Sequence, residues 1–172
     1  MLKQLFFTLL LVMLVGCEDS STNSSKESNN THSKSNITRA LTVLPQLDKS
    51  DLVAIKQICA DNSKSNRILI NFFASWCSGC VLEHKQLQQI TKKVPSVGIA
   101  YKDDNNNALS WLDQYPIQFT KKATDINGIV GSSYGVVALP ETLIISCDTY
   151  EKIYHKRGVI LDSDINDILN YF

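Results

Sequence analysis

Hydrophobic positions along this chain alternate between the spacing of strands and that of helices. Residues 68–74 form a nearly continuous apolar run rich in β-forming side chains, which is typical of a central strand covered on both faces. Residues 97–101 predict a second central strand. Residues 142–146 and 151–155 lie on either side of a short turn segment and predict a β-hairpin.

Helical periodicity fills the intervals between these strands. One predicted helix begins at Cys77 and ends before Pro95, and another begins after Asp104 and ends before Pro116. Strands that alternate with helices and finish in a hairpin predict an α/β fold with a mixed sheet and helices on both faces.

The two ends of the predicted domain carry weaker signals. Residues 41–44 predict a short edge strand before a proline, and residues 48–61 predict a first helix. Asp162 or Ser163 is the expected cap of a last helix. The lysine pair at 121–122 is interpreted as a solvated helix end or loop.

The N-terminus has the pattern of an export signal. A single positive charge, Lys3, precedes the uncharged apolar stretch 5–15, which is short for a membrane span. Residues 14–17, Leu-Val-Gly-Cys, resemble the lipobox of bacterial lipoproteins. This predicts a signal peptide at 1–16 and a lipid on Cys17; the alternatives are an ordinary cleaved signal or an uncleaved anchor.

A polar segment follows the predicted lipidation site. Residues 18–38 are dominated by Ser, Asn, Thr and Lys, so they cannot bury enough apolar surface to offset their ordering entropy. We expect residues 17–38 to be the lipidated cysteine and a flexible tether, and 39–172 to be one folded domain. Charges balance, with 17 basic and 17 acidic residues, and the scattered basic residues indicate no nucleic-acid partner.

The chemistry of the chain centres on two cysteines, Cys77 and Cys80, at the junction of a predicted strand and helix. A sulfur at the start of a helix faces unpaired N–H groups and the positive end of the macrodipole, which lowers the thiol pKa. A cysteine one turn later is near enough to close a small disulfide. The pair is therefore predicted to be a redox-active Cys77–Cys80 disulfide.

Other roles for the pair are a zinc half-site, a haem attachment site or a permanent structural disulfide. Zinc would need a second close ligand pair, which the remaining cysteines and histidines do not supply, so no metal is expected. Haem attachment would need a histidine where Val81 stands. Cys59 and Cys147 could form a second disulfide or remain buried thiols, and the sequence leaves this open.

With these residues in view, a family resemblance emerges. Residues 73–80, Phe-Ala-Ser-Trp-Cys-Ser-Gly-Cys, resemble the thioredoxin-like superfamily. Segments 101–104, 108–112, 134–136 and 140–142, in that order, are similar to the DsbE/CcmG proteins of cytochrome c maturation. The resemblance extends from about residue 68 to residue 158.

The resemblance implies roles for individual residues. Pro140 matches a cis-proline that faces the cysteine pair, and the backbone of Leu139 would pair with an incoming peptide. Glu83 matches an acidic residue that exchanges a proton with Cys80, and Trp76 would shield the disulfide or belong to the core. No cofactor is implied. Ser78-Gly79 departs from the proline common between the cysteines, so the redox potential does not transfer.

The implied function is reduction of the haem-binding cysteine pair of apocytochrome c. A membrane electron carrier of the CcdA or DsbD type would restore the dithiol, and the location would be the periplasmic side of the bacterial envelope, tethered by lipid. Family members usually carry a membrane helix instead. Alternatives are a general envelope disulfide reductase or oxidase, and a non-catalytic lipoprotein that binds peptides.

Overall fold

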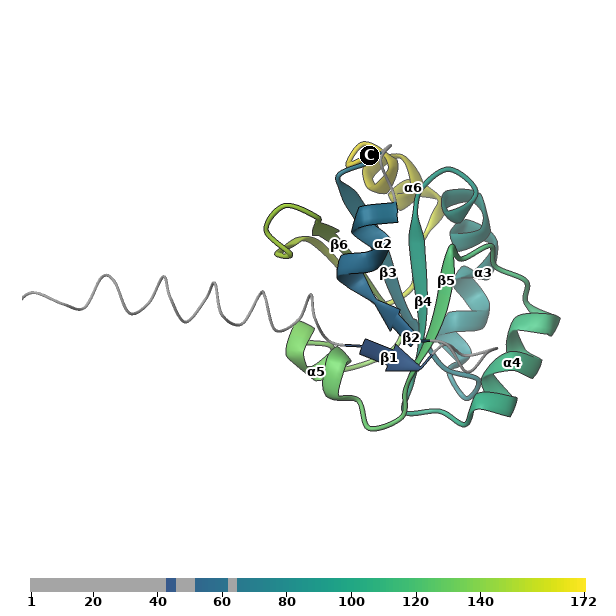
Figure 1. Ribbon diagram of the computed structural model, residues 1–172. Coiled ribbons are helices and arrows are strands. Elements are labelled where there is room, and N and C mark those ends of the chain that lie inside the picture. Colours follow the sequence, from purple (N-terminus) through teal and green to yellow (C-terminus); the bar gives the residue numbers. More distant parts are fainter. Residues whose placement is uncertain (1–42, 46–51, 62–64) are drawn as a thin grey trace, which may run out of the picture.

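A five-stranded mixed sheet forms the centre of the protein (Figure 1). The computed structural model describes residues 43–45, 52–61 and 65–172. The strand order is β5-β4-β3-β6-β7. The strands are β3 (Arg67–Phe73), β4 (Ser96–Tyr101), β5 (Lys121–Asp125), β6 (Glu141–Ser146) and β7 (Lys152–Arg157). β3, β4 and β5 are parallel, whereas β6 is antiparallel to both β3 and β7, so the predicted mixed sheet is confirmed.

Helices cover both faces of this sheet. One face carries α3 (Ser78–Thr91), α4 (Asn105–Gln114) and α6 (Asp162–Leu169), and the other carries α2 (Ile55–Asp61) and α5 (Ile129–Tyr134). β3 alternates between the two layers: Leu69 and Phe73 face α3, while Ile70 and its alternate neighbours face α2. Both faces of the central strand are therefore buried, which explains its continuous apolar run.

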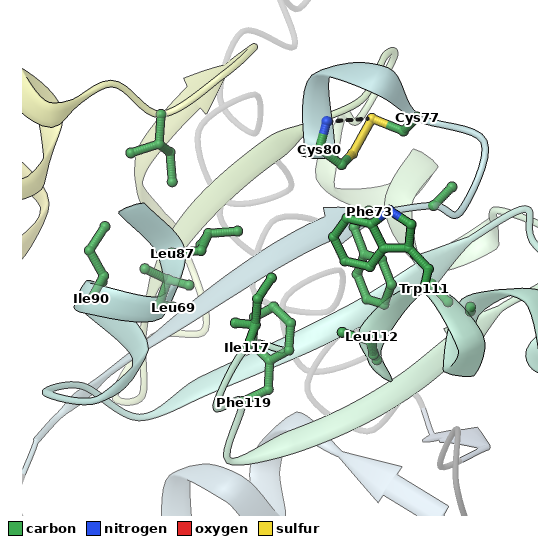
Figure 2. Packing of buried hydrophobic residues seen from close by; sticks show 14 of the residues in the cluster. Leu69, Phe73, Cys77, Cys80, Leu87, Ile90, Trp111, Leu112, Ile117 and Phe119 are labelled. Carbon is green, nitrogen blue, oxygen red and sulfur yellow. Dashed lines mark hydrogen bonds between the residues drawn. A yellow bond between two sulfur atoms is a disulfide. The ribbon is translucent and has the colours of Figure 1, made fainter. Parts of the chain in front are cut away.

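The α3 layer packs tightly up to the cysteine pair. Phe73 stacks on Trp111 of α4 with ring centroids 5.2 Å apart, and Leu87 and Ile90 of α3 fill the space over β3 (Figure 2). Burying each of these side chains stabilises the fold by about 1.5–3 kcal/mol. Because α3 is held along its length, its first turn has a fixed position at the end of β3.

The N-terminal part of the domain differs from its prediction. Leu52–Ala54 is not helical but forms β2, which pairs antiparallel with β1 (Val43–Pro45), and α2 begins only at Ile55. The apolar run at 52–55 fits both helical and strand periodicity, and residues 52–54 form a strand because they pair with β1. The predicted signal peptide, Cys17 and the tether lie outside the described residues.

Two further differences concern polar segments. Lys121 and Lys122 begin β5 rather than a loop, and the strand is fixed by parallel pairing with β4. The last helix is preceded by Leu161, whose N–H donates to the Asp164 carboxylate at 2.7 Å, so neither predicted cap residue caps it. Within the described ranges, no helix has the length and apolar character needed to cross a membrane.

Candidate active site

Cys77 and Cys80 lie at the N-terminus of α3, where β3 ends. Cys77 is the N-cap residue, and the Cys80 N–H donates to its sulfur at 3.1 Å (Figure 2). The two sulfurs form a disulfide. Cys77 is 5% exposed and Cys80 1%, so Cys77 is the more accessible of the two. A thiolate at the Cys77 position would accept the same N–H and face the positive end of the helix.

The turn before Cys77 is fixed by the loop that follows β4. The Asp103 carboxylate accepts the Ser75 N–H at 2.6 Å and the Ser75 hydroxyl at 2.9 Å. The Trp76 indole N–H donates to the Lys102 carbonyl at 3.3 Å. Trp76 is nevertheless 62% exposed, so it is not a core residue but part of the surface beside the disulfide. Asp103 lies in the family-like segment 101–104, but its sequence position alone does not reveal this role.

The loop before β6 approaches the cysteine pair from the other side. The Leu139–Pro140 peptide bond is cis. A Cβ built on Gly79 would lie 2.9 Å from Pro140 Cδ, so Pro140 packs directly against the residue between the cysteines. The Gly158 N–H donates to the Pro140 carbonyl at 2.9 Å. Only a glycine permits this close approach, which gives Gly79 a packing role that the sequence did not reveal.

Glu83 is completely buried on α3, one turn after Cys80. Its carboxylate accepts the Asn71 side-chain amide at 2.9 Å and the Ile160 N–H at 2.8 Å. Burial raises the pKa of Glu83 to about 7, and these two hydrogen bonds only partly oppose that rise. Glu83 can therefore exchange a proton near neutral pH. His84 points elsewhere, since its Nδ1 lies 2.7 Å from the Val81 carbonyl oxygen.

Asn71 connects Glu83 to the strand after the cis-proline. Its fully buried amide donates one hydrogen to Glu83 and the other to the Thr142 hydroxyl at 3.0 Å. Sequence reasoning missed this residue. The available signal was that Asn71 is the one polar side chain in the apolar run 68–74, where a buried amide needs partners.

A second disulfide joins Cys59 of α2 to Cys147 after β6. Cys147 follows Ser146, which pairs with Arg67 at the start of β3, whereas Cys77 follows the end of β3. The two disulfides are thus separated by about the length of a strand, roughly 20 Å. The bond fixes α2 to the far end of the sheet and takes no part in the cysteine-pair site.

A cavity of about 460 Å³ also lies at that far end, lined by residues such as Val94, Thr120 and Lys121. It does not include the cysteines. In the part of the chain that the structure describes, no group of three or more His, Cys, Asp or Glu side chains is arranged to hold a metal ion.

The fold and the site define a thioredoxin-fold protein with an oxidised cysteine pair at a helix N-terminus beside a cis-proline. The family model that matches is Redoxin, over residues 50–169, and the chain belongs to the Redoxin family. It is 39% identical over 90 residues to a thiol:disulfide interchange protein DsbE homolog of Paracoccus denitrificans, covering 52% of this chain and 49% of that one. DsbE of Pseudomonas aeruginosa is 33% identical over 103 residues, covering 59% and 56%. The chain thus spans about half the length of these relatives.

Solved structures confirm the fold. A secreted Mycobacterium tuberculosis disulfide oxidoreductase homologous to E. coli DsbE superposes with a TM-score of 0.62, at 17% identity, covering 78% of this chain and 96% of that one. A thioredoxin-related protein from Neisseria meningitidis gives a TM-score of 0.59 at 19% identity, covering 74% and 96%. The sequence prediction of a thioredoxin-like protein similar to DsbE is therefore confirmed.

Proposed function

We propose that the protein is a thiol-disulfide oxidoreductase that works as a reductase. The Cys77 thiolate attacks a disulfide of the substrate, forms a mixed disulfide and releases one substrate thiolate. The Cys80 thiolate then attacks the Cys77 sulfur, closes the Cys77–Cys80 disulfide and releases the second substrate thiol. Two electrons pass to the substrate. The observation that carries this proposal is the N-cap position of Cys77, one turn before a nearly inaccessible Cys80.

Glu83 is the proposed proton acceptor for Cys80. Cys80 must lose its proton before it can displace the substrate, and a carboxylate whose pKa is about 7 can accept that proton at neutral pH. Asn71 and Ile160 hold the carboxylate in one orientation. We assign Trp76, Leu139 and Pro140 to substrate docking, because the first is exposed beside the pair and the cis-proline packs on Gly79.

The proposed substrate is the haem-binding cysteine pair of apocytochrome c, with a CcdA- or DsbD-type membrane carrier as the electron donor. Support comes from the similarity to DsbE proteins and from the motifs around Pro140. The proposed location is the periplasmic side of the envelope, with a lipid on Cys17. The Cys59–Cys147 disulfide favours an oxidising compartment, because such bonds rarely persist in a reducing one.

A trapping experiment in intact cells tests the enzyme and its substrate. Cys80→Ser leaves Cys77 free to attack but removes the resolving thiol, so mixed disulfides should accumulate and be identifiable by mass spectrometry. Cys77→Ser is the matched control and should trap nothing. Recovery of apocytochrome c supports the full proposal. Recovery of unrelated envelope proteins alone would indicate a general envelope disulfide reductase. The absence of adducts from both variants would favour a peptide-binding lipoprotein.

Two further measurements test the direction of electron flow and the lipid anchor on Cys17. A reduction potential as high as that of strong oxidases would reverse the proposed electron flow. Metabolic labelling with a fatty acid should modify the wild-type chain, and Cys17→Ser should abolish the label and release the protein from membranes. Unlabelled wild-type protein would contradict the lipid anchor and leave the redox proposal intact.

A further inference from the structure

A buried carboxylate fixes the loop 137–139, which precedes the cis-proline and carries the proposed docking residue Leu139. Glu141, the residue after the cis-proline, is completely buried. One of its carboxylate oxygens accepts the N–H groups of Val137 and Ala138, both at 2.9 Å. Val137 is 79% exposed, so its side chain contributes little to holding the loop. The conformation of residues 137–139 therefore depends on where Glu141 is placed.

Glu141 is in turn placed by a histidine on the neighbouring strand. The Nε2 atom of His155, on β7, lies 2.5 Å from the second carboxylate oxygen of Glu141. Its Nδ1 lies 3.0 Å from the Lys152 ammonium, which also donates to the Tyr134 carbonyl. An ammonium can only donate, so Nδ1 must accept and Nε2 must carry the hydrogen. The geometry thus fixes a neutral imidazole that donates to Glu141.

The charges around His155 agree with this assignment. Burial lowers the pKa of His155, and the nearby Lys152 and Arg157 lower it further, against the effect of Glu141. Arg157 Nε lies 3.9 Å from the same Glu141 oxygen. The imidazole is therefore a fixed hydrogen-bond donor at neutral pH and a link between the ammonium of Lys152 and the docking loop.

We propose that His155 is a positioning residue for substrate binding, acting through Glu141 on the backbone of residues 137–139. This inference rests on the proposed function, since the loop matters only if a peptide docks there. It predicts a specific kind of defect. Without His155 the loop before Pro140 loses its fixed shape, whereas the cysteine pair, on α3, keeps its reactivity.

His155→Phe, His155→Gln and Tyr154→Phe make a matched set. Phenylalanine removes the donor, glutamine restores an N–H near the position of Nε2, and Tyr154 is the adjacent control, whose side chain packs in the α3 layer. With an oxidised peptide substrate we expect His155→Phe to raise KM about tenfold with kcat within twofold. The rate with a small aromatic disulfide should not change. His155→Gln and Tyr154→Phe should resemble wild type.

Amide hydrogen exchange tests the same inference without any turnover. The Val137 and Ala138 N–H groups should exchange at least about tenfold faster in His155→Phe, with β3 amides as internal reference. If His155→Phe does not fold, His155→Thr, too short to reach Glu141, takes its place. Unchanged exchange, an unchanged KM or a defect shared by His155→Gln would each overturn the inference. A wild-type protein inactive on both disulfides would instead overturn the proposed function, and the exchange data would still decide the role of His155.

Discussion

Two glutamates, both completely buried and on opposite faces of the same sheet, end in opposite states. Glu83 lies in the α3 layer and accepts two hydrogen bonds, from Asn71 and Ile160, and its pKa is raised to about 7 by burial. Glu141 lies in the layer of α2 and α5. Burial also acts to raise the pKa of Glu141, but two backbone N–H groups and His155 outweigh it, and the pKa falls below its ordinary value.

The difference shows that two factors decide which carboxylate can take a proton: how deeply it lies in the protein, where Glu83 exceeds Glu141, and how many donors it accepts. A carboxylate with too few donors is costly when charged, so it holds a proton near pH 7 and can exchange it. A fully paired carboxylate stays charged and serves as a fixed anchor. The predicted proton carrier, Glu83, has the first environment, and the loop anchor, Glu141, has the second.

The largest expected effect comes from removing the anchor. Glu141→Leu removes the acceptor of two backbone N–H groups and of His155, all of them part-buried, and a hydrogen bond to a charged group contributes about 1.5–3 kcal/mol. We expect the free energy of unfolding to fall by about 3–5 kcal/mol. Urea denaturation of the oxidised protein measures it.

Glu83→Leu is the matched control for this prediction. It also leaves two N–H donors without an acceptor, but it removes a carboxylate that is costly to bury when charged. At pH 8 the free energy of unfolding should therefore change by no more than about 1 kcal/mol. Equal losses for the two variants would contradict the contrast between the carboxylates.

The second prediction concerns stability against pH. Glu83 has a pKa of about 7 in the folded protein and 4.5 as an ordinary value, so between these values the folded state binds more protons than the unfolded chain. The Glu83 contribution to stability should therefore fall by about 3 kcal/mol as pH rises from 4.5 to 7, and His155, whose pKa burial lowers, acts in the opposite sense below pH 6.5. Glu141, with its lowered pKa, acts in the opposite sense, and its contribution is lost as pH falls below its ordinary value.

Urea midpoints of the oxidised protein across pH 4 to 8 measure this slope. Glu83→Gln cannot ionise, so the decline between pH 4.5 and 7 should disappear while the acid limb remains. A decline that persists in Glu83→Gln would assign it to another group.

The sequence could predict those features of the fold that depend on a local pattern of residues. The central strand, α3 and the cysteine pair follow from local signals, since the run 68–74 and the helical spacing after Cys77 each suffice. β5 does not: four of the five residues in its sequence Lys-Lys-Ala-Thr-Asp are polar, and only pairing with β4 makes it a strand. β2 likewise exists because β1 lies beside it.

The same reason explains the residues that were missed at the site. Glu83 could be proposed because the family resemblance implies an acidic residue at this position, near the cysteine pair. Asn71 and the Glu141–His155 pair act through contacts between different elements, and a single sequence does not show which side chains the fold brings together. The register of β6 against β3 and β7 places them.

The third prediction is kinetic. Glu83→Gln keeps the size of the side chain and one of its two accepted hydrogen bonds but cannot accept the Cys80 proton, so resolution of the mixed disulfide should slow about 100-fold at pH 7. Single-turnover stopped-flow separates this step from the first attack by Cys77, which should be unaffected. Slowing of both steps equally would place the defect in the helix rather than in proton transfer.

The smallest effect tests how finely the donors set the Glu83 pKa. Asn71→Leu removes one of the two hydrogen bonds to the carboxylate, and a hydrogen bond to a charged group is worth about 1.5–3 kcal/mol, so the pKa should rise by at least about one pH unit above 7. The carboxylic acid C=O stretch in the infrared, followed against pH, reports it. Thr142→Val removes the other partner of Asn71 without touching Glu83 and should leave the titration unchanged. A titration equally unmoved in Asn71→Leu would mean that burial alone sets the pKa of Glu83, and donor number would no longer explain why the two carboxylates differ.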